Sequence, residues 1–209
     1  LVKRYLLLLL LLVPTAVSAR IILIAGDSLS AAYGFPVEQG WVALLQQRLD
    51  AGDYPYRLVN ASISGDTTAN ARARLPAALA EHKPDVVMLA LGGNDGLRGL
   101  SLAGMKANLV AMIEGARAAG ARVLLVGVQL PPNYGPRYTQ AFEAIYRELA
   151  ADCDVSLLPS LVDGIGTERA LMQADGVHPN VDAQPLIRDR MWTALLPLLD
   201  RTAASDNPR

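Results

Sequence analysis

Cysteine and histidine are scarce in this chain of 209 residues, which holds one cysteine and two histidines. A single cysteine excludes an internal disulfide, and His82 and His178 alone leave little material for a zinc or iron centre. Cys153 stands between Asp152 and Asp154, whose charges disfavour the thiolate that a catalytic cysteine requires. We therefore interpret Cys153 as a structural thiol, and we expect neither a metal nor a cofactor.

An excess of charge of one sign is also missing. The chain has 19 Lys and Arg residues against 20 Asp and Glu residues, which gives a formal net charge of −1. Proteins that bind nucleic acid or anionic membranes carry basic runs or patches, and the sequence has no such run. We therefore expect no nucleic-acid partner. Independently of the charge, we expect a monomeric protein with a small-molecule substrate.

A hydrophobic run longer than a single strand occurs only near the N-terminus. Lys3 and Arg4 precede the apolar stretch Tyr5–Val13, and small residues follow at Ala16–Ala19. This order predicts a secretory signal peptide, and hence a periplasmic or secreted protein. An uncleaved membrane anchor is the alternative, but the apolar stretch is far shorter than the roughly 20 residues that a spanning helix needs.

The predicted signal peptide covers residues 1–19, with cleavage after Ala19. Its removal takes away two basic residues, which leaves 17 basic against 20 acidic residues and a formal net charge of −3. Residues 20–209 contain no repeat, linker or shift in composition, and their number is typical of one domain. We expect a single domain over residues 20–209, without a membrane span once the signal is removed.

Short apolar runs alternate with helical periodicity along the rest of the chain. Such runs predict buried strands, and apolar positions that recur with a period near 3.6 predict helices. The predicted strands are Ile21–Gly26, Leu58–Ala61, Val86–Leu91, Val123–Val128 and Val155–Leu158. The predicted helices are Trp41–Leu49, Thr67–Ala80, Leu102–Ala116, Tyr138–Leu149 and a last helix that starts at Pro185.

Single residues add expectations for three of these helices. Pro76 should kink the second helix or split it in two, because proline has no N–H and its ring clashes with the preceding turn. Ser101 is expected to cap the third helix at its N-terminus. The last helix is expected to bury Leu186, Ile187, Leu195 and Leu199.

Strands that alternate with helices require a parallel sheet that is covered on both faces. The predicted fold is therefore of the α/β class. We expect a flavodoxin-like, three-layer α/β/α domain with five parallel strands in the order 2-1-3-4-5. In such a sheet the carboxyl ends of all strands lie along one edge, so residues that directly follow strands are brought close together.

Ser28 follows the first predicted strand, in the sequence Gly26-Asp27-Ser28-Leu29. A serine at this point lies where open α/β sheets bind their ligands. The alternative is that Asp27 or Ser28 only caps the next turn, and we assign Asp27 no more than this structural role. A nucleophilic serine also needs a base and a third group that holds the base.

His178 is the better candidate for that base. His82 lies among charged residues at a helix end and is expected to be solvated. His178 follows the last predicted strand, and Asp175 lies three residues upstream, so one tight loop carries both side chains. The aspartate can then accept a hydrogen bond from one imidazole nitrogen while the other faces Ser28. Alternatively, Asp175 forms a turn and His178 caps a helix.

Two other stretches that follow strands offer hydrogen-bond donors for an oxyanion. Gly65 can expose its backbone N–H at a tight turn, and Asn94 carries a side-chain NH₂ within Gly92-Gly93-Asn94-Asp95. Each stretch taken alone can also be a helix start or a glycine-rich turn. Because all the candidate residues follow strands on the same edge of the sheet, their convergence favours an acyl-transfer site.

Together and in this order, the motifs resemble those of the SGNH hydrolases, also called the GDSL family. Gly26–Leu29 resembles the first block of that family, Gly65 the second, Gly92–Asp95 the third and Asp175–Pro179 the fifth. The likeness extends over the whole mature chain to bacterial periplasmic members described as thioesterase, protease, lysophospholipase and arylesterase. The resemblance implies Ser28 as nucleophile, His178 as its base with Asp175 as the residue that holds the imidazole, and Gly65, Asn94 and the Ser28 backbone N–H as oxyanion donors.

By this resemblance the chain is a serine hydrolase that cleaves aryl esters, acyl thioesters and lysophospholipids through an acyl-enzyme on Ser28. One alternative is a carbohydrate O-deacetylase of the same family, which would need a polar rim for its sugar. Others are a non-catalytic nucleotide- or phosphate-binding module and a catalytically inactive binding protein. The first strand is followed by no glycine-rich phosphate loop, which disfavours the nucleotide-binding module.

An acyl chain is expected in a shallow apolar groove between the loops 96–102 and 130–134. Leu97 and Leu130 are its predicted lining residues, together with Leu100. By the family resemblance, the first of these loops closes over the substrate. Alternatively, the three leucines belong only to the periphery of the core.

Overall fold

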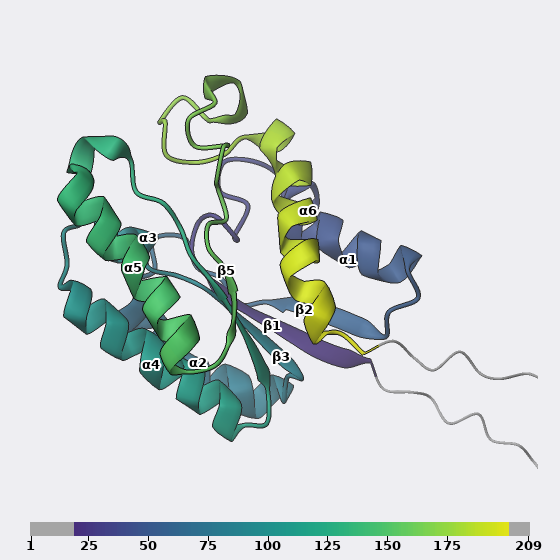
Figure 1. Cartoon of the computed structure of the whole chain (residues 1–209). Coiled ribbons are helices and arrows are strands. Elements are labelled where there is room, and N and C mark those ends of the chain that lie inside the picture. Colours follow the sequence, from purple (N-terminus) through teal and green to yellow (C-terminus); the bar gives the residue numbers. More distant parts are fainter. Residues whose placement is uncertain (1–18, 201–209) are drawn as a thin grey trace, which may run out of the picture.

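A computed structural model describes residues 19–200 of the chain (Figure 1). The basic and apolar parts of the predicted signal peptide fall outside these residues, as do residues 201–209. The described part forms a central sheet with helices on both of its faces.

The sheet contains five parallel strands in the order β2-β1-β3-β4-β5. The strands are β1 (Arg20–Gly26), β2 (Tyr56–Asn60), β3 (Val86–Ala90), β4 (Arg122–Val126) and β5 (Ser156–Leu158). Ile24 of β1 is paired with Asn60 of β2 and Met88 of β3, so β1 lies inside the sheet. The predicted α/β class and strand order are confirmed.

Two hydrophobic cores lie on opposite faces of the sheet, because alternate residues of a strand point to opposite sides. Leu23 belongs to one core and its neighbours Ile22 and Ile24 to the other. The first core is covered by α2 (Thr68–His82), α4 (Leu102–Ala118) and α5 (Pro136–Asp152), and the second by α1 (Trp41–Ala51) and α6 (Gln184–Leu195) (Figure 1).

Shorter helices lie in the connections. The helix α3 (Gly93–Leu97) follows β3 directly, at the carboxyl edge of the sheet. The 3-10 helices are η1 (Val37–Gln39), η2 (Pro132–Tyr134), η3 (Arg169–Leu171), η4 (Val181–Ala183) and η5 (Leu196–Leu198).

The helix α2 differs from its prediction. It runs unbroken across Pro76, so the predicted split is wrong. Pro76 lies on the exposed side of the helix, where water can satisfy the carbonyl group that the missing N–H leaves without a partner. The side chain of Thr67 caps this helix by accepting a hydrogen bond from the Asn70 N–H, as Ser101 caps α4 through the Gly104 N–H.

The burial of Leu186 in the last helix was also predicted wrongly. Ile187, Met191 and Leu195 of α6 are fully buried, and their spacing of four residues defines the face that packs on the sheet. Leu186 lies about 100° away around the helix and is 45% exposed.

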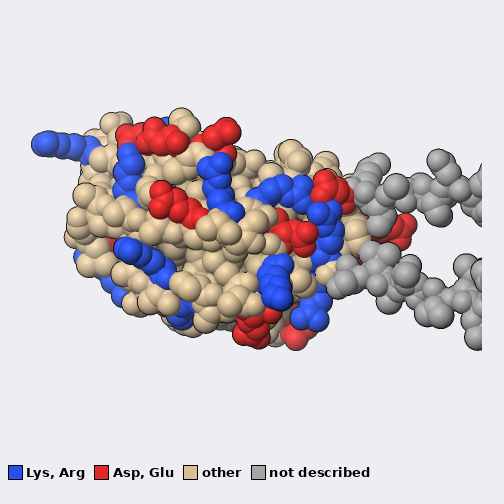
Figure 2. Space-filling model, turned by 90° about the horizontal axis from the view of Figure 1, so that it is seen from below, with Lys and Arg blue, Asp and Glu red and all other residues tan. Residues whose placement is uncertain are grey.

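The surface carries charges of both signs. Figure 2, which views the molecule from below, shows Lys and Arg residues interspersed with Asp and Glu residues over the visible face. Among residues 19–200, no helix is long and apolar enough to cross a membrane.

Candidate active site

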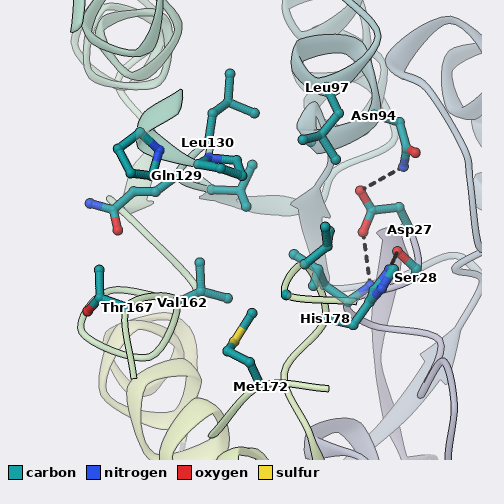
Figure 3. Close-up of a pocket in the computed structure, with 18 of the residues that line it drawn as sticks. Asp27, Ser28, Asn94, Leu97, Gln129, Leu130, Val162, Thr167, Met172 and His178 are labelled. Atoms are coloured by element: carbon teal, nitrogen blue, oxygen red, sulfur yellow. Dashed lines mark hydrogen bonds between the residues drawn. The ribbon is translucent and has the colours of Figure 1, made fainter. Parts of the chain in front are cut away.

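Ser28, His178 and Asp175 form a chain of hydrogen bonds at the carboxyl edge of the sheet. The Ser28 Oγ lies 2.9 Å from the His178 Nε2 (Figure 3). The His178 Nδ1 lies 2.7 Å from the Asp175 Oδ2. Ser28 comes from the loop after β1, whereas the other two residues come from the loop that precedes α6. With the proton on Nδ1, the imidazole donates to the carboxylate, and its Nε2 can accept the serine proton.

The Asp175 carboxylate also organises the turn that carries His178. Its Oδ1 accepts hydrogen bonds from the backbone N–H groups of Val177 at 2.9 Å and of His178 at 3.0 Å, and Gly176 adopts a positive φ of 67°. Burial by itself raises the pKa of Asp175, but the hydrogen bonds from His178 and Val177 outweigh it and lower the pKa to about 2. The group is therefore an anion at neutral pH, as the orientation of the imidazole requires.

The segment with Met172 and Gln173 supports the loop that carries His178. The Gln173 N–H donates to the His178 carbonyl at 2.8 Å, and Met172 pairs with Pro179 in an antiparallel bridge. The Gln173 side chain also donates to the carbonyl of Tyr33, whose ring packs on the imidazole with 4.4 Å between ring centres. The histidine is thus held by contacts from two loops that are distant in the sequence.

Three candidate hydrogen-bond donors follow the strands β1, β2 and β3, at the same edge of the sheet as the Ser28 hydroxyl. Within residues 19–200, the backbone N–H groups of Ser28 and Gly65 donate to no other group. The turn that holds Gly65 packs on the Ser28 loop, because the Ile63 N–H donates to the Gly26 carbonyl at 3.1 Å. The Asn94 Nδ2 donates one hydrogen bond to Asp27 Oδ2 at 3.3 Å, and its second N–H is left for a ligand.

Asn94 is carried by α3, which begins at a sharp turn. Gly92 has a φ of 117°, and a Cβ atom at this position would lie 2.2 Å from the Tyr146 hydroxyl. That hydroxyl donates to the Leu91 carbonyl at 2.8 Å inside the core. Only glycine fits both the backbone conformation and the space, so the end of β3 can turn directly into α3.

Asp95 joins α3 to the start of α2. Its buried carboxylate accepts hydrogen bonds from the Thr68 N–H at 2.8 Å and from the Thr68 hydroxyl at 2.6 Å. The turn with Gly65 lies just before Thr68 in the sequence, so this contact relates Gly65 to Asn94. This contact of Asp95 was not predicted from the sequence.

Asp27 is almost fully buried beside the candidate nucleophile, with 3% of its surface exposed. Its Oδ1 accepts from the Leu29 N–H at 3.1 Å and its Oδ2 from the Asn94 Nδ2 (Figure 3). Burial raises the pKa of Asp27 to about 6, although the Leu29 N–H, the charge of His178 and the Asn94 amide act in the opposite direction. The contacts with Asn94 go beyond the turn-capping role expected from the sequence.

A cavity of about 300 Å³ opens beside Ser28 (Figure 3). Both predicted lining residues, Leu97 and Leu130, contribute to its wall, and Val128 lies between β4 and Leu130. Leu100 lines no part of this cavity and is 43% exposed. The other side of the cavity is formed by residues that were not predicted to line it, namely Val162, Gly164, Gly166, Thr167 and Met172.

The remaining chemical candidates lie elsewhere. His82 is the last residue of α2, and its Nε2 lies 3.7 Å from the Oε1 of the neighbouring Glu81. The partly buried Cys153 follows α5. Within residues 19–200, no group of His, Cys, Asp and Glu side chains could hold a metal ion. The only histidine that meets a serine hydroxyl in this part of the chain is His178.

The chain is similar to known proteins over most of its length. Residues 24–184 match the GDSL-like Lipase/Acylhydrolase family. The chain is 53% identical to Esterase TesA of Pseudomonas aeruginosa over 91% of its length and 94% of that protein. It is 45% identical to thioesterase 1/protease 1/lysophospholipase L1 of Escherichia coli, over 92% of its own length and 91% of that protein. A crystal structure of TesA has 54% identity and a TM-score of 0.85, and the match covers 86% of this chain and all of that one.

Proposed function

Since the chain belongs to the GDSL-like lipase/acylhydrolase family, the SGNH hydrolases, and is an ester-cleaving enzyme, we propose that Ser28 is the residue that carries the acyl group. The supporting observation is the pair of hydrogen bonds that joins Ser28 to His178 and His178 to Asp175, at 2.9 and 2.7 Å. These are the contacts that a serine needs to attack a carbonyl at neutral pH.

The reaction would proceed in two halves. The Ser28 Oγ attacks the carbonyl carbon while the His178 Nε2 takes its proton, and the carbonyl oxygen becomes an oxyanion. The imidazolium then gives the proton to the leaving alcohol or thiol, and the acyl group stays on Ser28. A water molecule repeats the sequence, with His178 as its base, and releases the acid. Asp175 remains an anion throughout and stabilises the imidazolium.

The oxyanion would be held by three donors, namely the Ser28 N–H, the Gly65 N–H and the Asn94 Nδ2. Both backbone N–H groups donate to nothing else among residues 19–200, so a developing charge meets donors that need no rearrangement. This arrangement lowers the barrier because the interaction strengthens as the charge forms.

Replacing Asn94 with alanine tests this role. We expect kcat to fall by about 10²–10³-fold, with KM changed much less, because the lost hydrogen bond is strongest in the transition state. Steady-state kinetics on a p-nitrophenyl ester measure both constants. An effect confined to KM would mean that Asn94 only binds the substrate.

The acyl chain would occupy the cavity beside Ser28, between Leu97 and Leu130 on one side and Val162 and Met172 on the other. These four side chains are all apolar, which suits a hydrocarbon chain better than a sugar. We propose aryl esters, acyl thioesters and lysophospholipids as the substrate class. The names of the two curated relatives, an esterase and a thioesterase/lysophospholipase, support this choice.

The test of the substrate class is a panel of p-nitrophenyl esters, acyl-CoA thioesters and lysophospholipids of graded chain length, with Ser28→Ala protein as the blank. We expect kcat/KM to rise with chain length until the cavity is full. Hydrolysis restricted to acetylated carbohydrates would contradict the proposal and favour an O-deacetylase.

Filling the cavity at Gly166 should shorten the preferred chain. A Cβ at Gly166 would meet its nearest neighbour, the Val162 carbonyl oxygen, at 3.8 Å, so a side chain fits here without a backbone clash. In Gly166→Leu, each methylene excluded from the cavity should cost about 0.8 kcal/mol, or roughly fourfold in kcat/KM. Hydrolysis of p-nitrophenyl acetate, the shortest ester, should stay near the wild-type rate. The control is Gly115→Leu in α4, where a Cβ meets nothing within 4 Å. An equal loss of kcat/KM for esters of all chain lengths in Gly166→Leu would contradict the assignment of the cavity to the acyl chain.

The domain boundaries and location are proposed on the sequence evidence. We propose that residues 1–19 are a signal peptide, that residues 20–209 form a single domain, and that the enzyme works in the periplasm or outside the cell as a monomer. In this compartment lysophospholipids and other exported esters are more accessible substrates than cytosolic acyl-CoA.

A further inference from the structure

The carboxamide of Asn94 is held at both of its ends. Its Nδ2 donates to the Asp27 Oδ2 at 3.3 Å, and its Oδ1 accepts from the Arg98 Nη2 at 3.3 Å. An asparagine side chain can rotate by half a turn about its last bond and exchange its oxygen and nitrogen with little change in shape. Which of the two faces the cavity therefore depends on the partners of the amide.

The two partners require the same orientation. Asp27 as a carboxylate offers only acceptors, so the NH₂ group must point toward it. The Arg98 guanidinium offers only donors, so the carbonyl oxygen of the amide must point toward it. In the rotated amide an oxygen would face the carboxylate and an NH₂ group would face the guanidinium, and both hydrogen bonds would be lost.

Both carboxylate oxygens of Asp27 already accept a hydrogen bond, one of them from Asn94. Its second oxygen accepts from the Leu29 N–H at 3.1 Å, and 3% of the residue is exposed. A buried carboxylate at this position is costly, because charges lose their hydration when they are buried. A residue that only capped the turn after β1 would need the Leu29 contact and not the contact with Asn94.

Arg98 reaches a second oxyanion donor as well. The same Nη2 that contacts Asn94 donates to the Gly65 carbonyl at 2.9 Å. A Cβ atom added to Gly65 would lie 3.5 Å from this nitrogen, so the guanidinium lies against the turn in which the Gly65 N–H is exposed. A single nitrogen atom thus connects the α3 side chain to the turn after β2.

We propose that Asp27 and Arg98 are positioning residues of the oxyanion hole, which together keep the NH₂ group of Asn94 turned toward the substrate carbonyl. This inference rests on the proposed role of Asn94. Neither residue touches the reacting atoms, and both act through the amide that does.

Kinetics of single and double variants test the proposal. Asp27→Asn keeps the size of the side chain but offers one acceptor where two are needed, and Arg98→Met removes the donors of the guanidinium. Each change is made in the wild type and in Asn94→Ala. Arg72→Met is the matched control, because Arg72 also donates to an asparagine oxygen, that of Asn108 at 3.1 Å, on the outside of α2 and α4.

In the wild-type background we expect kcat to fall about 10–100-fold in Asp27→Asn and about 3–10-fold in Arg98→Met, with KM changed less than about twofold. In the Asn94→Ala background, each change should lower kcat by less than about twofold, because the amide on which it acts is absent. Arg72→Met should leave both constants unchanged.

Two results would overturn the proposal: equal losses with and without Asn94, or no loss in either variant. Circular dichroism and thermal unfolding establish that each variant is folded. If the buried Asp27→Asn change prevents folding, the exposed Arg98 variants carry the test alone. The outcome is separable from the proposed function, because an Asn94→Ala enzyme with full activity contradicts the oxyanion role itself, whereas additive losses contradict only the positioning role.

Discussion

Ser28→Ala should retain the fold and lose ester hydrolysis, with kcat reduced by about 10⁴–10⁶-fold. The change removes one oxygen atom, and with it the only hydroxyl within hydrogen-bond distance of the His178 Nε2 among residues 19–200. Because no acyl-enzyme can form on Ser28, only direct attack of water would remain, with His178 as its base and the oxyanion donors to stabilise the charge.

The measurement is hydrolysis of a p-nitrophenyl ester, followed by mass spectrometry after treatment with a fluorophosphonate, which should add to the wild-type serine and not to the variant. Ser30→Ala is a suitable control from the same loop. The Ser30 hydroxyl is buried and has no hydrogen-bond partner within residues 19–200, so its loss breaks no hydrogen bond. Full activity in folded Ser28→Ala protein would contradict the assignment of the nucleophile.

His178→Ala should cause a loss of the same size, about 10⁴–10⁶-fold in kcat. Without the imidazole, the serine proton has no acceptor, and the leaving group has no donor. The two side chains act as one unit, so the double variant Ser28→Ala/His178→Ala should be no less active than either single variant.

The matched control is His82→Ala, which removes the other histidine of the chain. His82 lies at the end of α2 beside Glu81 and does not line the cavity, so kcat should stay at the wild-type value. Comparable losses in both histidine variants would point to a general effect on the fold. A double variant with the product of the two single losses would mean that Ser28 and His178 do not work in one step.

The strands of the sheet could be predicted from the sequence because buried strands consist almost entirely of apolar residues. Continuous apolar runs such as Val86–Leu91 are required wherever helices cover both faces, and all five runs are strands in the structure. The errors occurred at the surface. Pro76 and Leu186 both lie on the exposed sides of helices. At Pro76, water can bind the carbonyl group that has lost its N–H partner, and at Leu186 the side chain does not have to pack against the core.

Membership of the GDSL family and an ester-cleaving activity were also predicted, and the comparisons confirm both. The short motifs carry this information because each one marks a turn at the end of a strand. The roles of Ser28, Asp175 and His178 stay predictions, although the structure places His178 within hydrogen-bond distance of both Ser28 and Asp175.

The wall of the cavity was predicted only on one side. Leu97 and Leu130 could be inferred because they follow strand ends, whereas Val162 and Met172 lie in an irregular segment between β5 and α6. Such a segment has no periodicity that relates its residues to a surface, and its path depends on the elements around it.

The local order of residues thus determined the strands and the serine at the edge of the sheet, because burial and turn geometry restrict which residue types can occupy those positions. The strand order was expected from the flavodoxin-like fold class. The contacts among Asp27, Asn94 and Arg98 depended on the folded chain. Asp27 and Asn94 are 67 positions apart in the sequence, and only the pairing of β1 with β3 brings the loops that follow them together. A buried carboxylate that looks like a turn cap in the sequence becomes, in three dimensions, a hydrogen-bond partner of the Asn94 side chain.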